Sequence, residues 1–329
     1  MSEIFIGALS FERRCIGALL AYLAEHDRVG DAILLDYAGD ATPGADALER
    51  RNAHYDAISR ACAERNVRAI RTRVSPYAMT PLRDIVRSAS VTANRVVVDI
   101  TCMTRPHVLS VAATVTEFDS WLVGYTRAVG YGNLGAADAN GGWRDTLVLP
   151  LHEDATLRNE GVALGLVLLG HEPARTGLAL DELEPGAGIV VSSLDQARPD
   201  LQRVALRTHG PLLNYLERLR MPGPRGALLH NYIDREGWDE AIVRLDALAD
   251  DAEAIARPLI AAARAVQGPI VLYPFGPKIT CFVFGRILAT AYREASWAVY
   301  PIPRSHPLDY SSGVGLTEWY SAETLVPRE

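Results

Sequence analysis

The amino-acid sequence predicts an α/β protein built from two Rossmann-like halves, each with a parallel sheet, that are related by internal duplication. Short apolar runs alternate with segments of helical periodicity from the N-terminus onward, which is typical of βαβ units. The same order of elements restarts after a polar segment at residues 152–160. Because 329 residues exceed the ~100–200 residues of an average domain, we expect an N-terminal half at 1–151, a connector at 152–160 and a C-terminal half at 161–329.

In the first half, the elements follow from continuous apolar runs, which indicate buried parallel strands, and from the 3.6-residue periodicity of helices. Strands are predicted at residues 4–9, 32–37, 67–74, 95–100 and 121–127. Helices are predicted between them, at residues 14–25, 48–65, 81–88 and 107–117. A loop rich in Gly, Ala and Asn follows at 130–142, and residues 146–151 predict one further strand at a sheet edge.

The second half repeats this order. Strands are predicted at residues 162–169, 188–192, 227–232, 269–273 and 297–302. Helices are predicted at residues 174–183, 211–219, 238–265 and 279–292. Residues 297–302 are the last strand that the pattern predicts, and a loop at 306–315 follows it.

Three short segments of the first half recur, in order, in the second half. Residues 12–17 correspond to 172–177, residues 96–101 to 270–275, and residues 120–123 to 296–299. Two βαβ arrays share a hydrophobic pattern without common origin, but periodicity does not require the Glu and Gly of the first segment or the Ser-Trp of the third. We therefore favour duplication, and either origin predicts the same fold class.

Composition excludes several classes of function. A net charge of −7 argues against broad, non-specific binding to nucleic acid. The four cysteines (Cys15, Cys62, Cys102 and Cys281) show no C-x-x-C spacing, so we expect reduced thiols and no metal site. The chain shows no signal peptide and no apolar run of ~18 residues, which predicts a cytoplasmic protein that makes no contact with a membrane.

A glycine motif at residues 130–135 fits the spacing G-x-G-x-x-G. It follows the fifth predicted strand rather than the first, and no helix is predicted after it, whereas dinucleotide binding requires the opposite context. We therefore expect no dinucleotide and no other cofactor.

The strand order points to the place where a ligand binds. Open parallel sheets bind ligands beyond the carboxyl ends of their strands, at the point where strand order reverses. In the common order 3-2-1-4-5, this point lies between the first and fourth strands of each half. The loops that follow these strands are residues 10–14 and 101–105 in the first half, and 171–175 and 275–278 in the second. These loops include the best-matched parts of the repeat.

The chemistry of these loops suits an anion. Arg105 and Lys278 each stand at the start of a helix, where free N–H groups and the helix dipole attract phosphate or carboxylate, and Thr101 and Thr104 offer hydroxyl groups. In the alternative interpretation, Thr104 is only an N-cap and the two cations are solvated. The candidate ligand-binding residues are Ser10, Glu12, Arg13, Thr101, Thr104, Arg105, His171, Arg175, Gly276, Lys278, Ser311 and Ser312.

Three carboxylates are candidates for a catalytic base: Glu12, Asp99 and Asp309. A carboxylate in the first turn of a helix also stabilises the dipole without any ligand, which is the simpler interpretation of Glu12 and Glu172. Cys102 lies near Arg105, but we expect an inert thiol rather than a nucleophile, because only His107 in the local sequence offers itself as a base.

The fourth strand of the first half ends in Asp99-Ile100-Thr101, and the turn after it closes on Thr104-Arg105. This pattern resembles the corresponding loop of CRISPR-associated Rossmann-fold (CARF) sensor domains, in which a Thr/Gly-rich turn ends in Thr-Lys and two such loops cradle a cyclic oligonucleotide. Pro277-Lys278 stands at the second copy, and Cys102-Met103 replaces the glycine pair of the family's turn.

The resemblance implies a nucleotide sensor whose two binding halves are fused in one chain, with a role in antiviral defence and with either a separate effector protein as partner or catalysis of its own. The residues alone leave two alternatives open. One is a hydrolase or transferase that acts on a nucleotide or phosphorylated small molecule. The other is a non-catalytic subunit of a larger assembly, in which these loops are structural.

Overall fold

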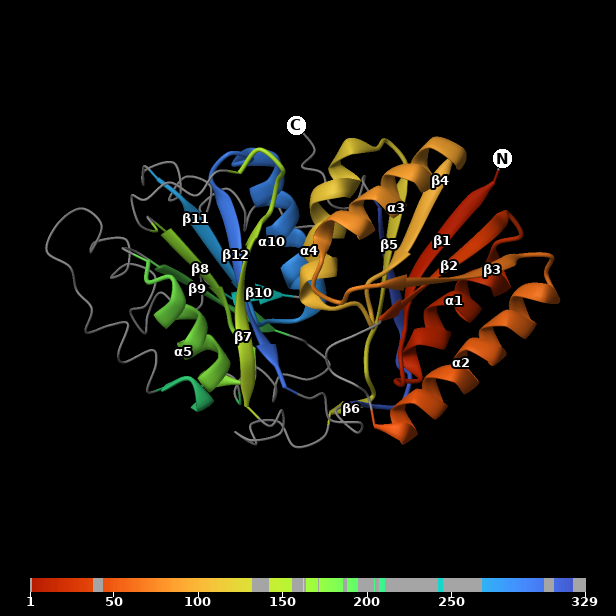
Figure 1. Ribbon diagram of the computed structural model, residues 1–329, viewed down its shortest axis with the longest axis horizontal. Helices are drawn as coiled ribbons and strands as arrows, with labels where there is room; N and C mark the ends of the chain where they lie inside the picture. The colour runs from red at the N-terminus through yellow and green to blue at the C-terminus, as the bar shows by residue number, and fades with distance from the viewer. Residues whose placement is uncertain are drawn as a thin grey trace, which may run out of the picture. The chain divides into compact units, whose positions relative to one another are not determined.

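The computed structural model describes residues 2–37, 44–131, 142–155, 162, 164–170, 172–185, 188–194, 204, 207–210, 242–244, 268–304 and 311–321. The chain forms two compact units (Figure 1). The first comprises Met1–Asn133 and Arg304–Thr324, and the second comprises Leu134–Pro303 and Leu325–Glu329. Both are α/β units with a mostly parallel, Rossmann-like sheet, so the predicted fold class is confirmed.

The sheet of the first unit has the strand order β14-β5-β4-β1-β2-β3. Its strands are β1 (Glu3–Leu9), β2 (Val29–Tyr37), β3 (Arg68–Val74), β4 (Arg95–Asp99), β5 (Trp121–Thr126) and β14 (Thr317–Ser321). All neighbours are parallel except β14, which runs antiparallel to β5. The predicted order 3-2-1-4-5 is therefore present, with a sixth strand added at the edge.

Helices cover both faces of this sheet. They are α1 (Arg14–Glu25), α2 (Ala45–Ala63), α3 (Met79–Thr92) and α4 (Arg105–Thr114), which continues into a short 3-10 turn, η1 (Val115–Glu117). Helices α1 and α2 lie on one face and α3 and α4 on the other (Figure 1), as right-handed crossovers require. Phe5 and Leu9 of β1 pack against Leu19 and Leu23 of α1 and Ile58 of α2 in the core of one face.

The sheet of the second unit has the order β10-β9-β8-β11-β12-β7. Its strands are β7 (Trp143–Pro150), β8 (Leu164–Leu168), β9 (Gly188–Leu194), β10 (Ile242–Arg244), β11 (Ile270–Pro274) and β12 (Ser296–Pro303). Helix α5 (Pro173–Glu182) follows β8, and α10 (Lys278–Ala291) follows β11. The edge strand β7 is again antiparallel, so both sheets have the same strand order and the same antiparallel edge.

The two antiparallel edge strands are exchanged between the halves of the sequence. Strand β7 follows β5 along the chain but pairs with β12 of the second sheet. Strand β14 ends the described chain and pairs with β5 of the first sheet. The strand predicted at 146–151 therefore exists at a sheet edge, but it belongs to the sheet of the second unit. The sequence pattern did not predict β14, or the short pair β6 (Gly130–Tyr131) and β13 (Ser311–Ser312).

Trp319 explains how β14 is held. Its ring lies directly over Gly124 of β5, where any Cβ atom would collide with it. The ring also packs at 5.0 Å from the ring of Tyr22 on α1. A glycine in β5 thus makes room for the largest side chain of the exchanged strand.

One predicted helix is wrong in part. The span 238–265 was expected to be helical, but Ile242–Arg244 form β10, which is parallel to β9. The β-branched residues Ile242 and Val243 favour a strand, and pairing with β9 overrides helical periodicity there. The remainder of that span, the predicted strand 227–232 and the predicted helix 211–219 lie outside the described residues.

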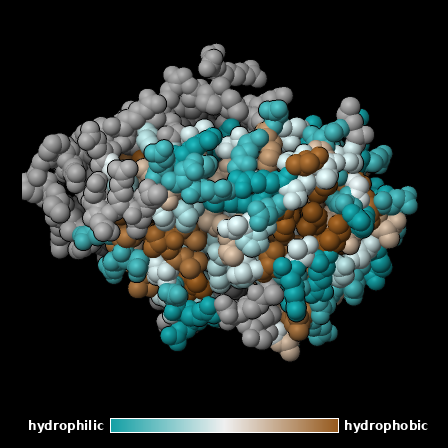
Figure 2. Space-filling view, turned by 45° about the horizontal axis from the view of Figure 1, so that its top comes forward, coloured by the Kyte–Doolittle hydropathy of each residue, from teal (hydrophilic) through white to brown (hydrophobic). Residues whose placement is uncertain are grey.

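Helix α3 is longer than predicted at both ends. It begins before Pro81 because this proline lies in the first turn, where the missing N–H costs nothing. No helix in the described ranges is both long and apolar enough to cross a bilayer. Figure 2 shows apolar side chains interspersed with hydrophilic ones on the face that it draws.

Candidate functional site

The site predicted for the first unit lies where β1 and β4 end. The two strands are parallel neighbours with Gly7 opposite Asp99, so the loops that follow them leave the same edge of the sheet. The chain runs from β1 to β2 on one side and returns to β4 on the other, which makes this edge the point of reversal. The structure thus brings together the two loops expected to meet.

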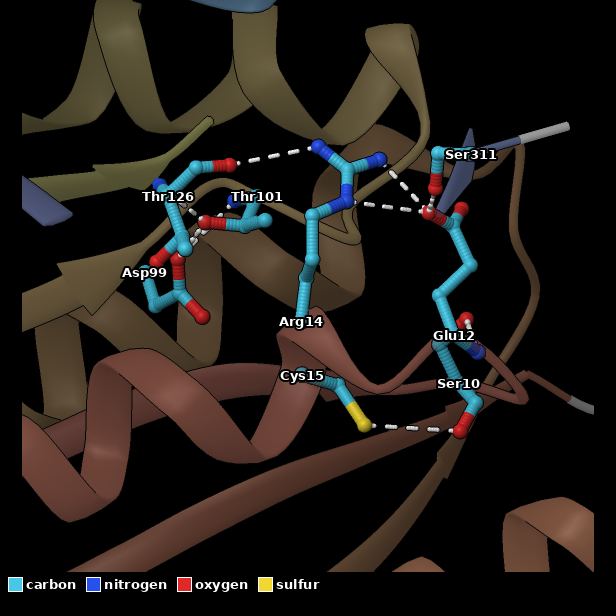
Figure 3. Close-up of polar contacts among 8 residues, drawn as sticks. All are labelled: Ser10, Glu12, Arg14, Cys15, Asp99, Thr101, Thr126 and Ser311. Atoms are coloured by element: carbon cyan, nitrogen blue, oxygen red, sulfur yellow. Dashed lines mark hydrogen bonds and ion pairs between the residues drawn. The ribbon is translucent and has the colours of Figure 1, made fainter. Parts of the chain in front are cut away.

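Arg14, the first residue of α1, organises this edge (Figure 3). Its Nη2 and Nε atoms lie 2.5 and 3.2 Å from Oε2 of Glu12, and Nη1 donates to the carbonyl of Thr126 at 3.2 Å. The hydroxyl of Ser311 donates to the same carboxylate oxygen. Burial lowers the pKa of Arg14, but the charges of Glu12, Cys102 and Tyr125 and the hydrogen bond to Glu12 together raise it above its ordinary value, so the guanidinium stays charged.

Arg13 was among the predicted ligand-binding residues, whereas Arg14 was not. Arg13 is exposed, whereas only 4% of Arg14 is accessible to solvent. A comparison of the two copies could have identified Arg14, because an arginine follows the matched glutamate by two residues in the first half and by three in the second. Glu12 fixes the loop after β1, because its carboxylate contacts Arg14 and Ser311 and its N–H donates to Ser10 Oγ at 3.2 Å.

Asp99 fixes the loop after β4. It is 1% exposed and accepts hydrogen bonds from the N–H of Thr101, at 3.0 Å, and from the Thr101 hydroxyl. The Thr101 oxygen in turn accepts the N–H of Thr126 at 2.8 Å. The Asp99 carboxylate is thus enclosed among main-chain and hydroxyl donors, and the proton of the Thr101 hydroxyl has a protein acceptor.

Thr104 precedes α4 but its side chain does not cap the helix. Its hydroxyl donates to the carbonyl of Pro76, and its N–H donates to the Tyr37 hydroxyl at 3.2 Å. In this conformation neither Thr101 nor Thr104 has a hydroxyl proton left for a ligand. What the edge offers to an anion is the first turn of α4, without a side-chain cap, and the half-buried Arg105.

In the second unit, Arg175 corresponds to Arg14. Its Nη1 donates to Glu172 at 3.1 Å, and Nη2 donates to the carbonyl of Pro301 at 3.0 Å. Its guanidinium also lies 4.3 Å from the ring of Tyr300, and the rings of Trp143 and Phe275 stand at 5.2 and 5.7 Å. These contacts fix Arg175 inside the unit.

The loops after β8 and β11 also meet. Gly170 leaves no room for a Cβ atom beside the carbonyl of Phe275, and Gly276 is buried, with its Cβ position 3.3 Å from Leu168 Cβ. Lys278 begins α10 after Pro277, and again no side chain caps the helix. The start of α10 thus repeats the start of α4 with Lys in place of Arg.

Ser311 contacts Glu12, whereas Ser312 is exposed in β13. His171 and Asp309 lie outside the described residues. Burial raises the pKa of the Cys15 thiol to about 12, and Cys102 is half-buried. In the ranges that the structure describes, no group of His, Cys, Asp and Glu side chains is arranged to hold a metal ion.

No protein-family model matches the chain, and no curated protein matches it. Among solved structures, it is similar to Can2 from Sulfobacillus thermosulfidooxidans in complex with cyclic tetra-adenylate, with 13% identity and a TM-score of 0.29. The match covers 38% of this chain and 32% of the Can2 chain, so the chain spans about a third of that protein's length.

Proposed function

We propose that the first unit binds an anionic, nucleotide-like ligand at the start of α4, and that the protein is a ligand-responsive regulatory protein. One observation carries the proposal. At the reversal point of the sheet, α4 begins without a side-chain cap and with Arg105 as its first residue. The first turn lacks one donor, because Pro106 has no N–H, but its remaining N–H groups, the helix dipole and a guanidinium form the kind of donor set that binds phosphate in many α/β proteins.

The surrounding polar groups support a rigid site. Glu12, Asp99, Thr101 and Thr104 are all engaged in hydrogen bonds within the first unit. Fixed loops lose little conformational entropy when a ligand binds, which favours affinity. The same engagement argues for binding rather than catalysis, because Glu12 is held by Arg14 and Ser311, and Asp99 is enclosed.

The resemblance of the loop after β4 to CARF domains makes cyclic oligoadenylates the first ligands to test. On this proposal the protein acts in antiviral defence through a separate effector protein. Lys278, at the start of α10, provides an equivalent anion contact in the second unit.

The test is a thermal-shift screen of cyclic and linear oligoadenylates, nucleoside phosphates and pyrophosphate, followed by titration calorimetry. Arg105→Ala is expected to weaken binding of the ligand found by roughly 1.5–3 kcal/mol, the range for a hydrogen bond to a charged group. Arg68→Ala is the charge-matched control. Arg68 begins β3, at the amino end of the strands, and its side chain is 72% exposed.

Equal affinity of Arg105→Ala and Arg68→Ala would place the ligand elsewhere. A ligand that the wild type hydrolyses or transfers would instead favour the enzyme alternative.

A further inference from the structure

A buried histidine lies behind the proposed anion site. His107, in the first turn of α4, is 0% exposed. Its Nε2 atom lies 3.0 Å from the carbonyl oxygen of Ala78, and its Nδ1 atom lies 3.1 Å from the Tyr37 hydroxyl. A carbonyl oxygen only accepts hydrogen bonds, so the proton of the neutral ring is on Nε2 and Nδ1 is the acceptor.

With this tautomer, the directions of the two hydrogen bonds that link His107, Tyr37 and Thr104 follow. The Tyr37 hydroxyl donates to His107 Nδ1 and accepts the N–H of Thr104 at 3.2 Å. Burial lowers the pKa of His107 to about 4, although the carbonyls of Ala78 and Ser75 oppose this effect. The ring is therefore neutral at pH 7, which this arrangement requires.

The chain of hydrogen bonds joins three segments of the first unit. Tyr37 is the last residue of β2, Ala78 precedes α3, and Thr104 precedes α4. The Thr104 hydroxyl adds a bond to Pro76, in the same connection as Ala78. The start of α4 is thus held on one side by the end of β2 and on the other by the connection between β3 and α3.

We infer that Tyr37 and His107 are positioning residues that hold the first turn of α4, and with it Arg105, in the geometry that binds an anion. The inference rests on the proposed function. Neither side chain needs to touch the ligand. Without the Tyr37 hydroxyl, the Thr104 N–H loses its acceptor directly before the first turn, and the helix start is free to shift away from the ligand.

The experiment compares Tyr37→Phe with Tyr22→Phe. The control also removes a hydroxyl that donates a hydrogen bond, to Glu3 at 2.7 Å, but at the start of β1, the amino end of the sheet. The probe is inorganic pyrophosphate, titrated while the backbone amide signal of Arg105 is followed by NMR. We expect Tyr37→Phe to weaken the affinity about five- to tenfold, as for one lost hydrogen bond, and Tyr22→Phe to leave it within about twofold.

A pair of His107 variants separates positioning from general packing. His107→Asn places a carboxamide oxygen near the Nδ1 position and keeps an acceptor for Tyr37, whereas His107→Gln places its amide near Nε2 and keeps only the bond to Ala78. If the hydrogen bonds from His107 through Tyr37 to Thr104 position the site, His107→Asn retains more affinity for pyrophosphate than His107→Gln. A purely structural role predicts that affinity follows thermal stability in both variants.

The outcomes distinguish this inference from the proposed function. If pyrophosphate shifts the Arg105 amide in the wild type, and Tyr37→Phe binds as tightly as Tyr22→Phe, the inference is wrong and the site stands. If the wild type shows no shift, the proposed function fails at this site and the inference fails with it.

Discussion

The guanidinium of Arg14 donates to the carbonyl of Thr126 at the end of β5, at 3.2 Å. In the second unit, Arg175 donates to the carbonyl of Pro301 in β12 at 3.0 Å. Each arginine lies in the first turn of the helix after the first parallel strand of its unit, β1 or β8, and each pairs with a glutamate just before that turn. We call this arginine, with its bonds to the glutamate and to a strand carbonyl, the arginine clamp. Hydrophobic periodicity does not require an arginine clamp, so its presence in both units supports internal duplication.

Arg14→Ala is expected to destabilise the protein by about 3 kcal/mol. The substitution removes a buried partner of Glu12 and leaves the Thr126 carbonyl without that donor, and broken buried pairs cost about 3–5 kcal/mol. The adjacent Arg13→Ala is the control, because Arg13 is exposed and exposed substitutions usually change stability by less than about 0.5 kcal/mol. Urea unfolding of both variants gives the comparison, and equal stabilities would show that the clamp contributes nothing.

Two glycine substitutions test the packing of the exchanged strand. Gly124→Ala is expected to destabilise the protein by about 1–3 kcal/mol, because the added methyl group displaces Trp319 from β5. Gly177→Ala is expected to stabilise it by about 0.5–1 kcal/mol, because Gly177 is helical and nothing lies within 4 Å of its Cβ position. Differential scanning calorimetry measures both. A Gly124→Ala protein as stable as the wild type would contradict the contact between β5 and β14.

His107 makes the stability depend on pH. Its pKa is lowered to about 4 in the folded state, so the unfolded chain, with the ordinary pKa of about 6.5, takes up the proton first as the pH falls. The stabilisation that the neutral His107 ring provides is complete above about pH 6.5. As the pH falls towards 4, it is lost progressively, and the free energy of unfolding decreases by about 3 kcal/mol in all.

His107→Asn should remove this part of the pH dependence. The measurement is the free energy of unfolding of wild type and variant between pH 7 and pH 4. Parallel curves would mean that His107 does not titrate as described.

The cysteines should differ in reactivity. The pKa of Cys15 is raised to about 12 by burial, and burial also raises that of Cys62, so neither forms much thiolate at pH 8. Cys281 is buried, whereas Cys102 is half-buried in the loop after β4. Iodoacetamide labelling of the native protein, read by peptide mass spectrometry, should modify Cys102 first. Faster labelling of Cys15 would contradict its enclosure.

Hydrophobic pattern predicted most of the fold, because central parallel strands are continuous apolar runs and the helices between them are periodic. Helix α1 was predicted with its observed bounds, Arg14–Glu25. Strand β14 was missed because its sequence, Thr-Glu-Trp-Tyr-Ser, is largely polar and becomes a strand by pairing with β5 and by the fit of Trp319 to Gly124. No local pattern indicates that the edge strands are exchanged.

The position of the candidate site was also predictable, since the order of parallel strands determines which loops meet. The state of its side chains was not. The hydroxyl protons of Thr101 and Thr104 are taken by Asp99 and Pro76, and the contact with Pro76 depends on a segment far away in the sequence. The same holds for Tyr37, which lies 67 residues from Thr104.

The most direct test of the proposed anion site is a crystal structure of the protein with the ligand that the nucleotide screen identifies. We predict a phosphate group at the start of α4, within hydrogen-bonding distance (~3 Å) of the Arg105 guanidinium and of first-turn backbone N–H groups. Glu12 should remain paired with Arg14. A ligand bound away from the edge where β1 and β4 end, with no contact to Arg105 or to the first turn of α4, would contradict it.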